Sequence, residues 1–250
     1  MAPRYLSKET LESRENDILD QAQAIIHQEG FPMLTMDKLI GQVSYSKGTV
    51  YNHFTSKEDV FVALCNRDMK KKIAMFIKAT SLDSCARFKM LSACMSYLIS
   101  VLLSPNNFVL NACTNAESFD KASESRANEH VELNDTLRET CNSVIEEAVA
   151  NNELTLPEGK SLDEISLTIY SMVFGSIGLF LKKETMACPQ EGLILENILL
   201  SHVNIVMDGL QWKQTDADQQ AFIKQLKQTV LADEVATLKR QGIDLDSATF

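Results

Sequence analysis

Apolar residues recur at helical spacing along most of this chain of 250 residues, and few helix breakers interrupt them. The sequence has only 9 glycines and 5 prolines, which is few for a protein built from many tight turns. This pattern disfavours an all-β sandwich or a glycine-rich α/β fold and predicts an all-α protein. One short helix is expected to begin at residue 36, and the others to cover about 9–29, 47–53, 57–79, 83–103, 105–115, 117–151, 162–186, 191–212 and 217–241.

Composition separates this chain from disordered and membrane-embedded proteins. Hydrophobic residues make up 45% and charged residues 23%, as in ordinary soluble domains. The longest apolar stretches, 91–103 and 169–181, are shorter than the roughly 18 residues that span a bilayer. We therefore expect buried helices and no membrane partner.

Cysteine usage and the first residues indicate the compartment. The sequence has 6 cysteines without a CxxC pair, and its first eight residues lack the apolar core of a signal peptide. Both features predict free thiols in a reducing cytoplasm.

The charge is distributed unevenly along the chain. The net charge is -10, yet residues 1–75 contain ten basic and ten acidic residues and are neutral. An acidic protein is a poor general binder of nucleic acid. A neutral DNA-reading segment attached to an acidic body remains compatible with this distribution.

The segment from residue 35 to residue 60 has the pattern of a helix-turn-helix. Two short helices are joined by a tight turn, and apolar residues are available for contacts between them, namely Leu39, Ile40, Val43 and Val50. The major groove of DNA admits a helix of this kind.

The second short helix has an outer face of small or hydrogen-bonding side chains. They are Ser46, Lys47, Thr49, Asn52 and His53, with Gly48 allowing close approach of the backbone. Helix N-termini at Thr35 and Ser56 offer free N–H groups to phosphate, and Lys57 adds a cation. These side chains predict base and phosphate contacts.

The run GTVYNHFTSKEDV at residues 48–60 resembles the DNA-binding domain of the tetracycline-repressor (TetR) family. The resemblance covers roughly residues 12–60. The family usually has Ala-Gly-Val before the recognition helix, where this chain has Val43, Ser44 and Tyr45. A positive φ at Ser44 would cost about 1 kcal/mol. Tyr45 indicates either local repacking or a phenol exposed near DNA.

The resemblance implies a role for each residue of the motif. Tyr51, Lys57 and Thr35 would contact phosphates, while Val50 and Phe54 would anchor the helix in the core. Four residues would face the groove, namely Ser46, Lys47, Thr49 and His53, and an N-terminal arm with Arg4, Lys8 and Arg14 could reach nearby DNA.

The resemblance also implies a three-helix DNA-binding domain at residues 1–60 and a helical dimerisation and ligand-binding domain at 61–241. The last nine residues, 242–250, have no strong helical signal and are expected to fray. The dimer interface is expected on the helices at 162–186 and 191–212, at Ile169, Val173, Ile177, Leu195, Leu199, His202 and Val206. An apolar pocket is expected at Met95, Tyr97, Phe108, Cys113, Phe119, Met172 and Phe174. Such stripes of residues are also what an ordinary core contains.

These observations predict a homodimeric, cytoplasmic transcriptional regulator, a repressor that a small apolar or amphipathic inducer releases from a palindromic operator in double-stranded DNA. The alternative is a helical protein-protein adaptor that uses the helix-turn-helix as a scaffold or to place another partner on DNA. The amphipathic helix at 217–241 is the feature that supports it. No catalytic motif, metal-ligand pattern or cofactor motif is present in the sequence, so we expect no enzyme, metal or cofactor.

Overall fold

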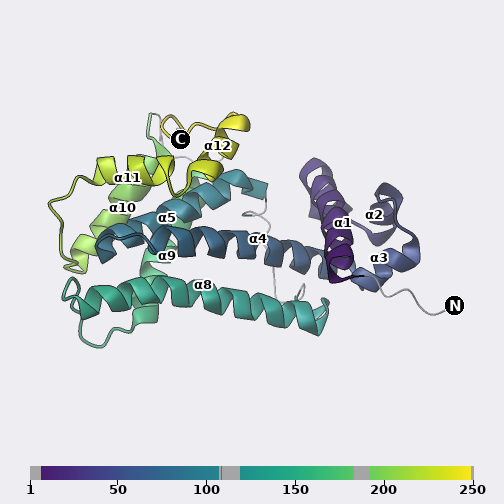
Figure 1. The fold of residues 1–250 in the computed structure, drawn as a ribbon, viewed down its shortest axis with the longest axis horizontal. Helices are drawn as coiled ribbons and strands as arrows, with labels where there is room; N and C mark the ends of the chain where they lie inside the picture. Colours follow the sequence, from purple (N-terminus) through teal and green to yellow (C-terminus); the bar gives the residue numbers. More distant parts are fainter. Residues whose placement is uncertain (1–6, 107, 109–118, 183–191, 249–250) are drawn as a thin grey trace. The chain divides into compact units, whose positions relative to one another are not determined.

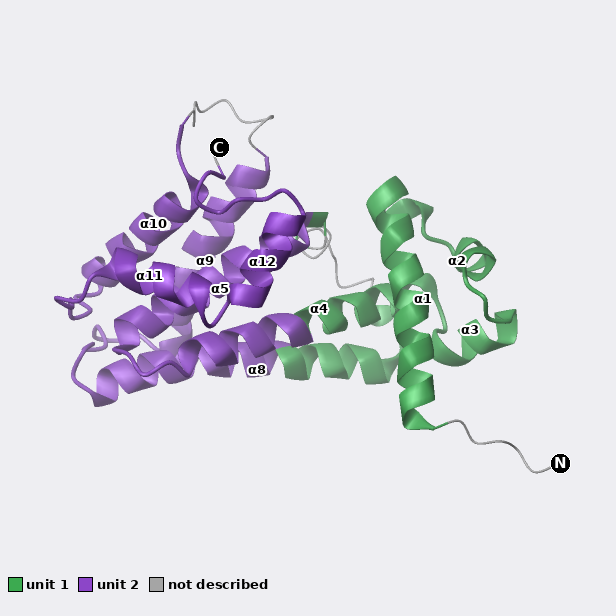
Figure 2. Ribbon diagram, turned by 45° about the horizontal axis from the view of Figure 1, so that its top comes forward, with its two compact units in different colours: residues 1–69, 106–133 green, residues 70–105, 134–250 purple. Residues whose placement is uncertain are grey.

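The computed structural model describes residues 7–106, 108, 119–182 and 192–248, and the regular elements in these ranges are helices (Figure 1). This confirms the all-α prediction. The chain divides into two compact units, unit 1 with residues 1–69 and 106–133 and unit 2 with residues 70–105 and 134–250 (Figure 2). The division falls within two long helices, α4 (Lys57–Thr80) and α8 (Glu124–Ala150).

Unit 1 contains α1 (Lys8–Glu29), the 3₁₀ turn η1 (Phe31–Met33), α2 (Met36–Gln42) and α3 (Lys47–His53), with the first turns of α4 and α8. The ends of α1 follow from its sequence. Ser7 accepts a hydrogen bond from the backbone N–H of Thr10, and Gly30 stops the helix with a φ of 87°.

The core of unit 1 joins α1, α2, α3 and α4. Val50 and Phe54, from α3 and the residue after it, have no exposed surface. They pack in one cluster with Ile18, Leu19, Ala22, Ile25, Ile26, Leu34, Leu39, Val60, Ala63 and Leu64. One side of α3 is therefore fixed inside unit 1.

Unit 2 is organised around α5 (Ala86–Leu103), which contacts α9 (Leu162–Leu181), α10 (Leu195–Gly209), α11 (Gln219–Gln228) and α12 (Ala232–Arg240). A buried arginine ties α5 to the end of α10. Arg87 donates hydrogen bonds to the Trp212 carbonyl (3.1 Å), to Asn204 Oδ1 (2.7 Å) and to Asp208 Oδ1 (2.7 Å).

Two helices among the described residues are long and apolar enough to span a membrane by length and composition alone, α5 and α9. The apolar stretch of α5 is 83% buried inside the fold, as in the core helix of a soluble protein. That of α9 is only 28% buried, so α9 leaves much apolar surface uncovered within one chain.

The C-terminal segment differs from the expected single helix at 217–241. It forms α11 and α12 with a turn between them, where the Leu231 N–H donates to the Leu226 carbonyl (3.0 Å). In a straight helix Leu226 and Leu231 would lie on different faces, because each residue advances the helix by about 100°. The turn allows both of them, and Leu238, to be buried in one unit.

Residues 242–248, expected to form part of a frayed tail, are placed by contacts in the structure. Leu245 is buried, and the Ala248 carbonyl accepts a hydrogen bond from the Leu195 N–H at 3.0 Å. Most of the helix expected at 105–115 lies outside the described residues.

Candidate nucleic-acid interface

The two short helices of the expected helix-turn-helix are present, and each begins at a capping hydroxyl. Thr35 Oγ1 accepts from the Lys38 N–H (3.2 Å), and Ser46 Oγ accepts from the Thr49 N–H (3.1 Å). Such caps satisfy backbone donors that a helix leaves free at its start. The sequence encodes both caps locally, which is why the boundaries of α2 and α3 could be predicted.

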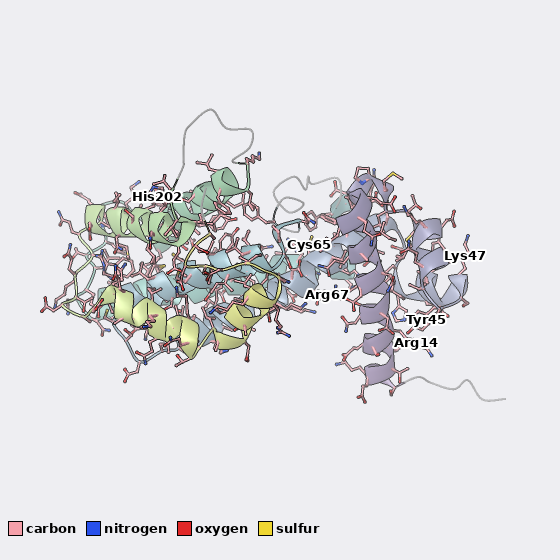
Figure 3. The ribbon with its side chains drawn as sticks, turned by 90° about the horizontal axis from the view of Figure 1, so that it is seen from above. Arg14, Tyr45, Lys47, Cys65, Arg67 and His202 are labelled. Atoms are coloured by element: carbon pink, nitrogen blue, oxygen red, sulfur yellow. The ribbon has the colours of Figure 1, made fainter. Side chains whose placement is uncertain are left out.

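The turn between α2 and α3 has no left-handed strain at Ser44. In the described part of the chain, positive φ outside glycine occurs at Asn152 and Gln211 only. Tyr45 repacks rather than projecting free, because its hydroxyl donates to Asp17 Oδ2 at 2.6 Å and the Arg14 guanidinium lies 5.7 Å from its ring centroid (Figure 3). Asp17 raises the pKa of Tyr45, since the hydrogen bond favours the neutral phenol.

The outer face of α3 carries most of the expected DNA-binding residues. Lys47, Gly48, Tyr51 and Asn52 are exposed, as is Ser46 at the cap, while Thr49 is half-buried. A Cβ added to Gly48 would meet only Ser46 Oγ, at 3.9 Å, so this position has open space in front of it. Polar side chains surround an open stretch of backbone, as a helix entering a groove requires.

Weak contacts hold the two lysines of this surface. Lys47 Nζ lies 3.5 Å from Asp37 Oδ1 and 5.7 Å from the Tyr51 ring centroid, with both charged side chains largely exposed. Lys57 Nζ lies 5.4 Å from the ring centroid of Phe31. Exposed ion pairs contribute about 0–1 kcal/mol, so a phosphate could replace Asp37 as the partner of Lys47 at little cost.

His53 lies apart from the other expected contact residues. Its side chain is 9% exposed and points toward α1, where Nδ1 lies 3.7 Å from Glu15 Oε2. In this structure the ring belongs to the inner side of α3 and not to the outer face.

A buried carboxylate, absent from the residues singled out from the sequence, organises the end of α3. Asp59 is 1% exposed. Its Oδ2 accepts from the Thr55 N–H (3.0 Å), and its Oδ1 accepts from the N–H (3.0 Å) and the hydroxyl (2.7 Å) of Ser123. Arg126 Nε lies 3.5 Å from Oδ1.

Burial by itself raises the pKa of Asp59. The hydrogen bonds from Thr55 and Ser123, together with the charge of Arg126, outweigh burial and leave the pKa below its ordinary value. Asp59 is therefore held as a carboxylate. The sequence shows it only as an acid in the first turn of a helix, because its partners Ser123 and Arg126 lie more than sixty residues away.

The residues expected at the dimer interface mostly pack within the chain. Ile169, Val173, Ile177, Leu195 and Leu199 are between 0% and 3% exposed. His202 Nδ1 lies 2.8 Å from Ser176 Oγ, and Val206 is half-buried. Ile169 and Val173 line an apolar cavity with residues of α4, α5 and α8, and His202 contacts α9. Burial leaves most of this set little surface for a second copy.

The residues expected at the pocket are dispersed. Met95 is completely buried, Met172 is 38% exposed, and Phe174 is half-buried beside Tyr170. Phe108 and Phe119 belong to unit 1, and Cys113 lies outside the described residues. Of this set, only Tyr97 lines the small apolar cavity of about 50 Å³ that Phe76, Met90, Ala93, Cys94, Cys141, Ser166, Ile169, Tyr170 and Val173 also line.

Burial raises the pKa of both cysteine thiols at this cavity, Cys94 and Cys141, the latter to about 11. Both are therefore neutral, apolar groups at physiological pH. A larger cavity of about 520 Å³ lies among α10, α11, α12 and the segment that follows them. No group of three or more potential metal ligands occurs among the residues that the structure describes.

We expect Asp59→Asn to lower the free energy of unfolding by about 2–3 kcal/mol at neutral pH, because it removes a buried, hydrogen-bonded charge. The pKa of Asp59 is lowered in the folded state, so its contribution is complete above the ordinary value of 3.8 and is lost as the pH falls below that value. The difference between variant and wild type should therefore shrink below about pH 4. Urea unfolding followed by circular dichroism measures the free energy of unfolding of both proteins at each pH.

Asp163→Asn is the matched control, since its carboxylate also has a lowered pKa, caused first by the hydrogen bond from Asn142, but lies at the surface. It should change stability much less than Asp59→Asn. Equal effects of the two variants, or an Asp59→Asn effect that does not depend on pH, would contradict the assignment.

The N-terminal segment is similar in sequence to known regulatory proteins. The sequence profile of the family described as bacterial regulatory proteins, tetR family, matches residues 18–64. An uncharacterized HTH-type transcriptional regulator, YfiR, of Bacillus subtilis is 33% identical over 61 residues, which are 24% of this chain and 29% of that protein. An HTH-type transcriptional repressor of Mycobacterium tuberculosis is 29% identical over 70 residues, 28% of this chain and 37% of that protein. The chain thus matches about a third of these curated relatives.

Solved structures resemble a much larger part of the chain. The crystal structure of a transcriptional regulator, FadR, from Bacillus subtilis in complex with stearoyl-CoA aligns with a TM-score of 0.61 at 15% identity, over 78% of this chain and 98% of that one. This identity is low, so the likeness concerns the fold. The segment at residues 18–64 is thus similar to the tetR family of bacterial regulatory proteins, and the helical fold resembles that of the FadR structure.

Proposed function

We propose that this protein is a sequence-specific transcriptional repressor that binds a palindromic operator as a homodimer. One observation carries the proposal: the inner side of α3 is fixed by Val50 and Phe54, both without exposed surface, while its outer face is polar and open. A helix held in this way can enter the major groove without unfolding.

Phosphate contacts would position the protein on DNA. The N-terminus of α2 at Thr35 and that of α4 near Ser56 are suited to bind phosphate, since helix N-termini favour anions. Lys57 is at the start of α4, and the Tyr51 ring is 41% exposed on α3. These groups would fix the register without reading sequence.

Base contacts would come from the first turns of α3. Hydrogen-bond donors and acceptors are available there on side chains of different length, those of Ser46, Lys47, Thr49 and Asn52. Gly48 lets the backbone approach the groove. In this arrangement His53 supports the helix from its inner side through Glu15.

We propose a dimer interface on the uncovered face of α9 and α10. Leu167 is 61% exposed and Ile205 is 63% exposed, and α9 adds the small residues Gly175 and Gly178 near the same side. Small residues let two helices approach closely, and apolar exposure of this extent is typical of an interaction surface. A two-fold dimer would present two copies of α3 to one operator.

We also propose that an apolar or amphipathic small molecule releases the repressor from DNA by entering the cavity beside Cys94 and Cys141. The cavity of about 50 Å³ is far smaller than a typical ligand site, so the ligand would have to open it. Stearoyl-CoA in the structure of the Bacillus subtilis FadR makes acyl compounds the first to test. The ligand would act by favouring a state that binds DNA less well.

The adaptor alternative loses its expected docking surface in this structure. The apolar residues of the C-terminal segment that would have bound a partner are largely used inside unit 2, where Ile223, Leu226 and Leu238 are buried and Phe222 stacks on Phe88 with ring centroids 4.4 Å apart.

Selection of bound DNA from a random pool should yield a palindrome, and two substitutions then test the contact surface. Lys57→Glu should weaken operator binding and lower its salt dependence by about one phosphate contact. Gly48→Ala should fold normally, because its Cβ has open space in the free protein, but should lose about tenfold or more in affinity where the DNA fills that space.

Lys224→Glu is the control, because it makes the same change of charge on an exposed position of α11. Fluorescence anisotropy at several salt concentrations measures the operator affinity of all three variants. Wild-type operator affinity in both Lys57→Glu and Gly48→Ala would contradict the proposal that this surface contacts DNA.

Leu167→Glu and Ile205→Glu should each weaken the dimer by about thirtyfold or more, since an interface centre tolerates buried charge poorly. Val131→Glu is the matched control on α8, where Val131 is 60% exposed. Sedimentation velocity over a range of concentrations gives the dissociation constants. An unchanged dimer in both variants, or a monomeric wild type, would refute this interface.

The ligand proposal is tested with stearoyl-CoA and decanoate as probes in the operator-binding assay. At least one should lower operator affinity by about fivefold or more, the usual lower range of allosteric coupling. Ala93→Val, which adds two methyl groups to the cavity lining, should keep operator affinity and reduce the response. No response to either probe, or an identical response in the variant, would count against this cavity.

A further inference from the structure

One arginine at the start of α8 touches three other elements of unit 1. Arg126 NH1 donates to Glu15 Oε1 of α1 (3.0 Å), and NH2 donates to the His53 carbonyl at the end of α3 (3.3 Å). Its Nε lies 3.5 Å from Asp59 Oδ1 of α4, and its guanidinium carbon lies 4.7 Å from the Phe54 ring centroid.

The same turn of α8 also fixes the loop that follows α3. Asp59 binds Ser123 through its Oδ1 and the backbone of Thr55 through its Oδ2, so one carboxylate joins the start of α8 to that loop. Asn66 of α4 donates to the Arg126 carbonyl at 3.0 Å and adds a further link between α4 and α8.

These contacts meet at the C-terminal end of α3 and at the loop that follows it. The helix has 7 residues, and isolated helices of that length are marginal in water. Its orientation therefore depends on tertiary contacts at its inner side and its two ends. At its C-terminus, the Arg126 guanidinium donates to a backbone carbonyl, where a positive charge is favoured.

We propose that Arg126, together with Asp59, is a positioning clamp that sets the orientation of the recognition helix α3 and thereby operator affinity, without touching DNA. The inference rests on the proposed DNA-binding function and assigns to this site a control element on α8. Arg126 is only 16% exposed at its side chain and its three nitrogens all face protein partners, so it does not offer its charge to a phosphate.

The clamp lies on a helix that also reaches the apolar cavity. Cys141, which lines that cavity, belongs to α8 as Arg126 does. The helix is shared by the two units, with Arg126 in unit 1 and Cys141 in unit 2.

The test compares Arg126→Gln with Arg138→Gln, a control on the same helix whose guanidinium forms exposed ion pairs with Asp135 and Asp163. Arg126→Gln should weaken operator binding by about tenfold. The slope of affinity against salt should stay at the wild-type value, because no phosphate contact is lost. Arg138→Gln should match the wild type.

Hydrogen exchange of the free protein supplies a readout that does not depend on DNA. In Arg126→Gln the amides of residues 49–56 should exchange faster than in the wild type, while those in the middle of α5 should not change. This readout tests the clamp even where the wild type shows no operator binding, so failure of the clamp and failure of the proposed function are distinguishable.

Wild-type affinity of Arg126→Gln would overturn the proposal, and so would unchanged exchange at residues 49–56. A salt slope lowered by about one would identify Arg126 as a phosphate contact and would also overturn it. Should Arg126→Gln fail to fold, Ser123→Ala removes one hydrogen bond to Asp59, and Glu15→Gln removes the negative charge that faces Arg126 and His53. Each should then show a smaller loss of affinity with an unchanged salt slope, and wild-type behaviour of both would refute the clamp.

Discussion

The burial of Val50 and Phe54 in the core of unit 1 is the constraint on which the outer face of α3 depends. Neither side chain has exposed surface, and both pack with apolar residues of α1, α2 and α4. A helix of 7 residues has little stability of its own, so this packing and the two ends determine how its polar side faces outward. Ser46 caps the first end and the Arg126 guanidinium bonds the last carbonyl.

Local features of unit 1 could be predicted from the sequence because their causes lie within a few residues. Thr35 and Ser46 cap helices whose first turns they precede directly, and Gly30 ends α1 in the left-handed conformation that glycine permits. The arrangement of Asp59 and Arg126 could not be predicted, since folding brings them together across more than sixty residues.

The same distinction between local and long-range causes explains where unit 2 differs from the predictions. Apolar periodicity identified α9 and α10 correctly, but periodicity cannot tell which apolar side packs inside the chain. Ile169 and Leu199 turned out to be buried, whereas Leu167 and Ile205 are exposed. The break between α11 and α12 likewise depends on burial of leucines from both helices against the rest of unit 2 and not on a helix-breaking residue.

The charge distribution fits the proposed function, because the net charge of -10 lies outside the first 75 residues, which are neutral and so do not repel DNA by their net charge. Guanine methylation interference on a selected operator tests the central claim most directly, since it reports which N7 atoms in the major groove are needed for binding. We predict interference in two major-groove segments related by a two-fold axis, with centres one helical turn apart, about 34–36 Å, or a multiple of it. Interference in a single segment, or none in the major groove, would contradict the account.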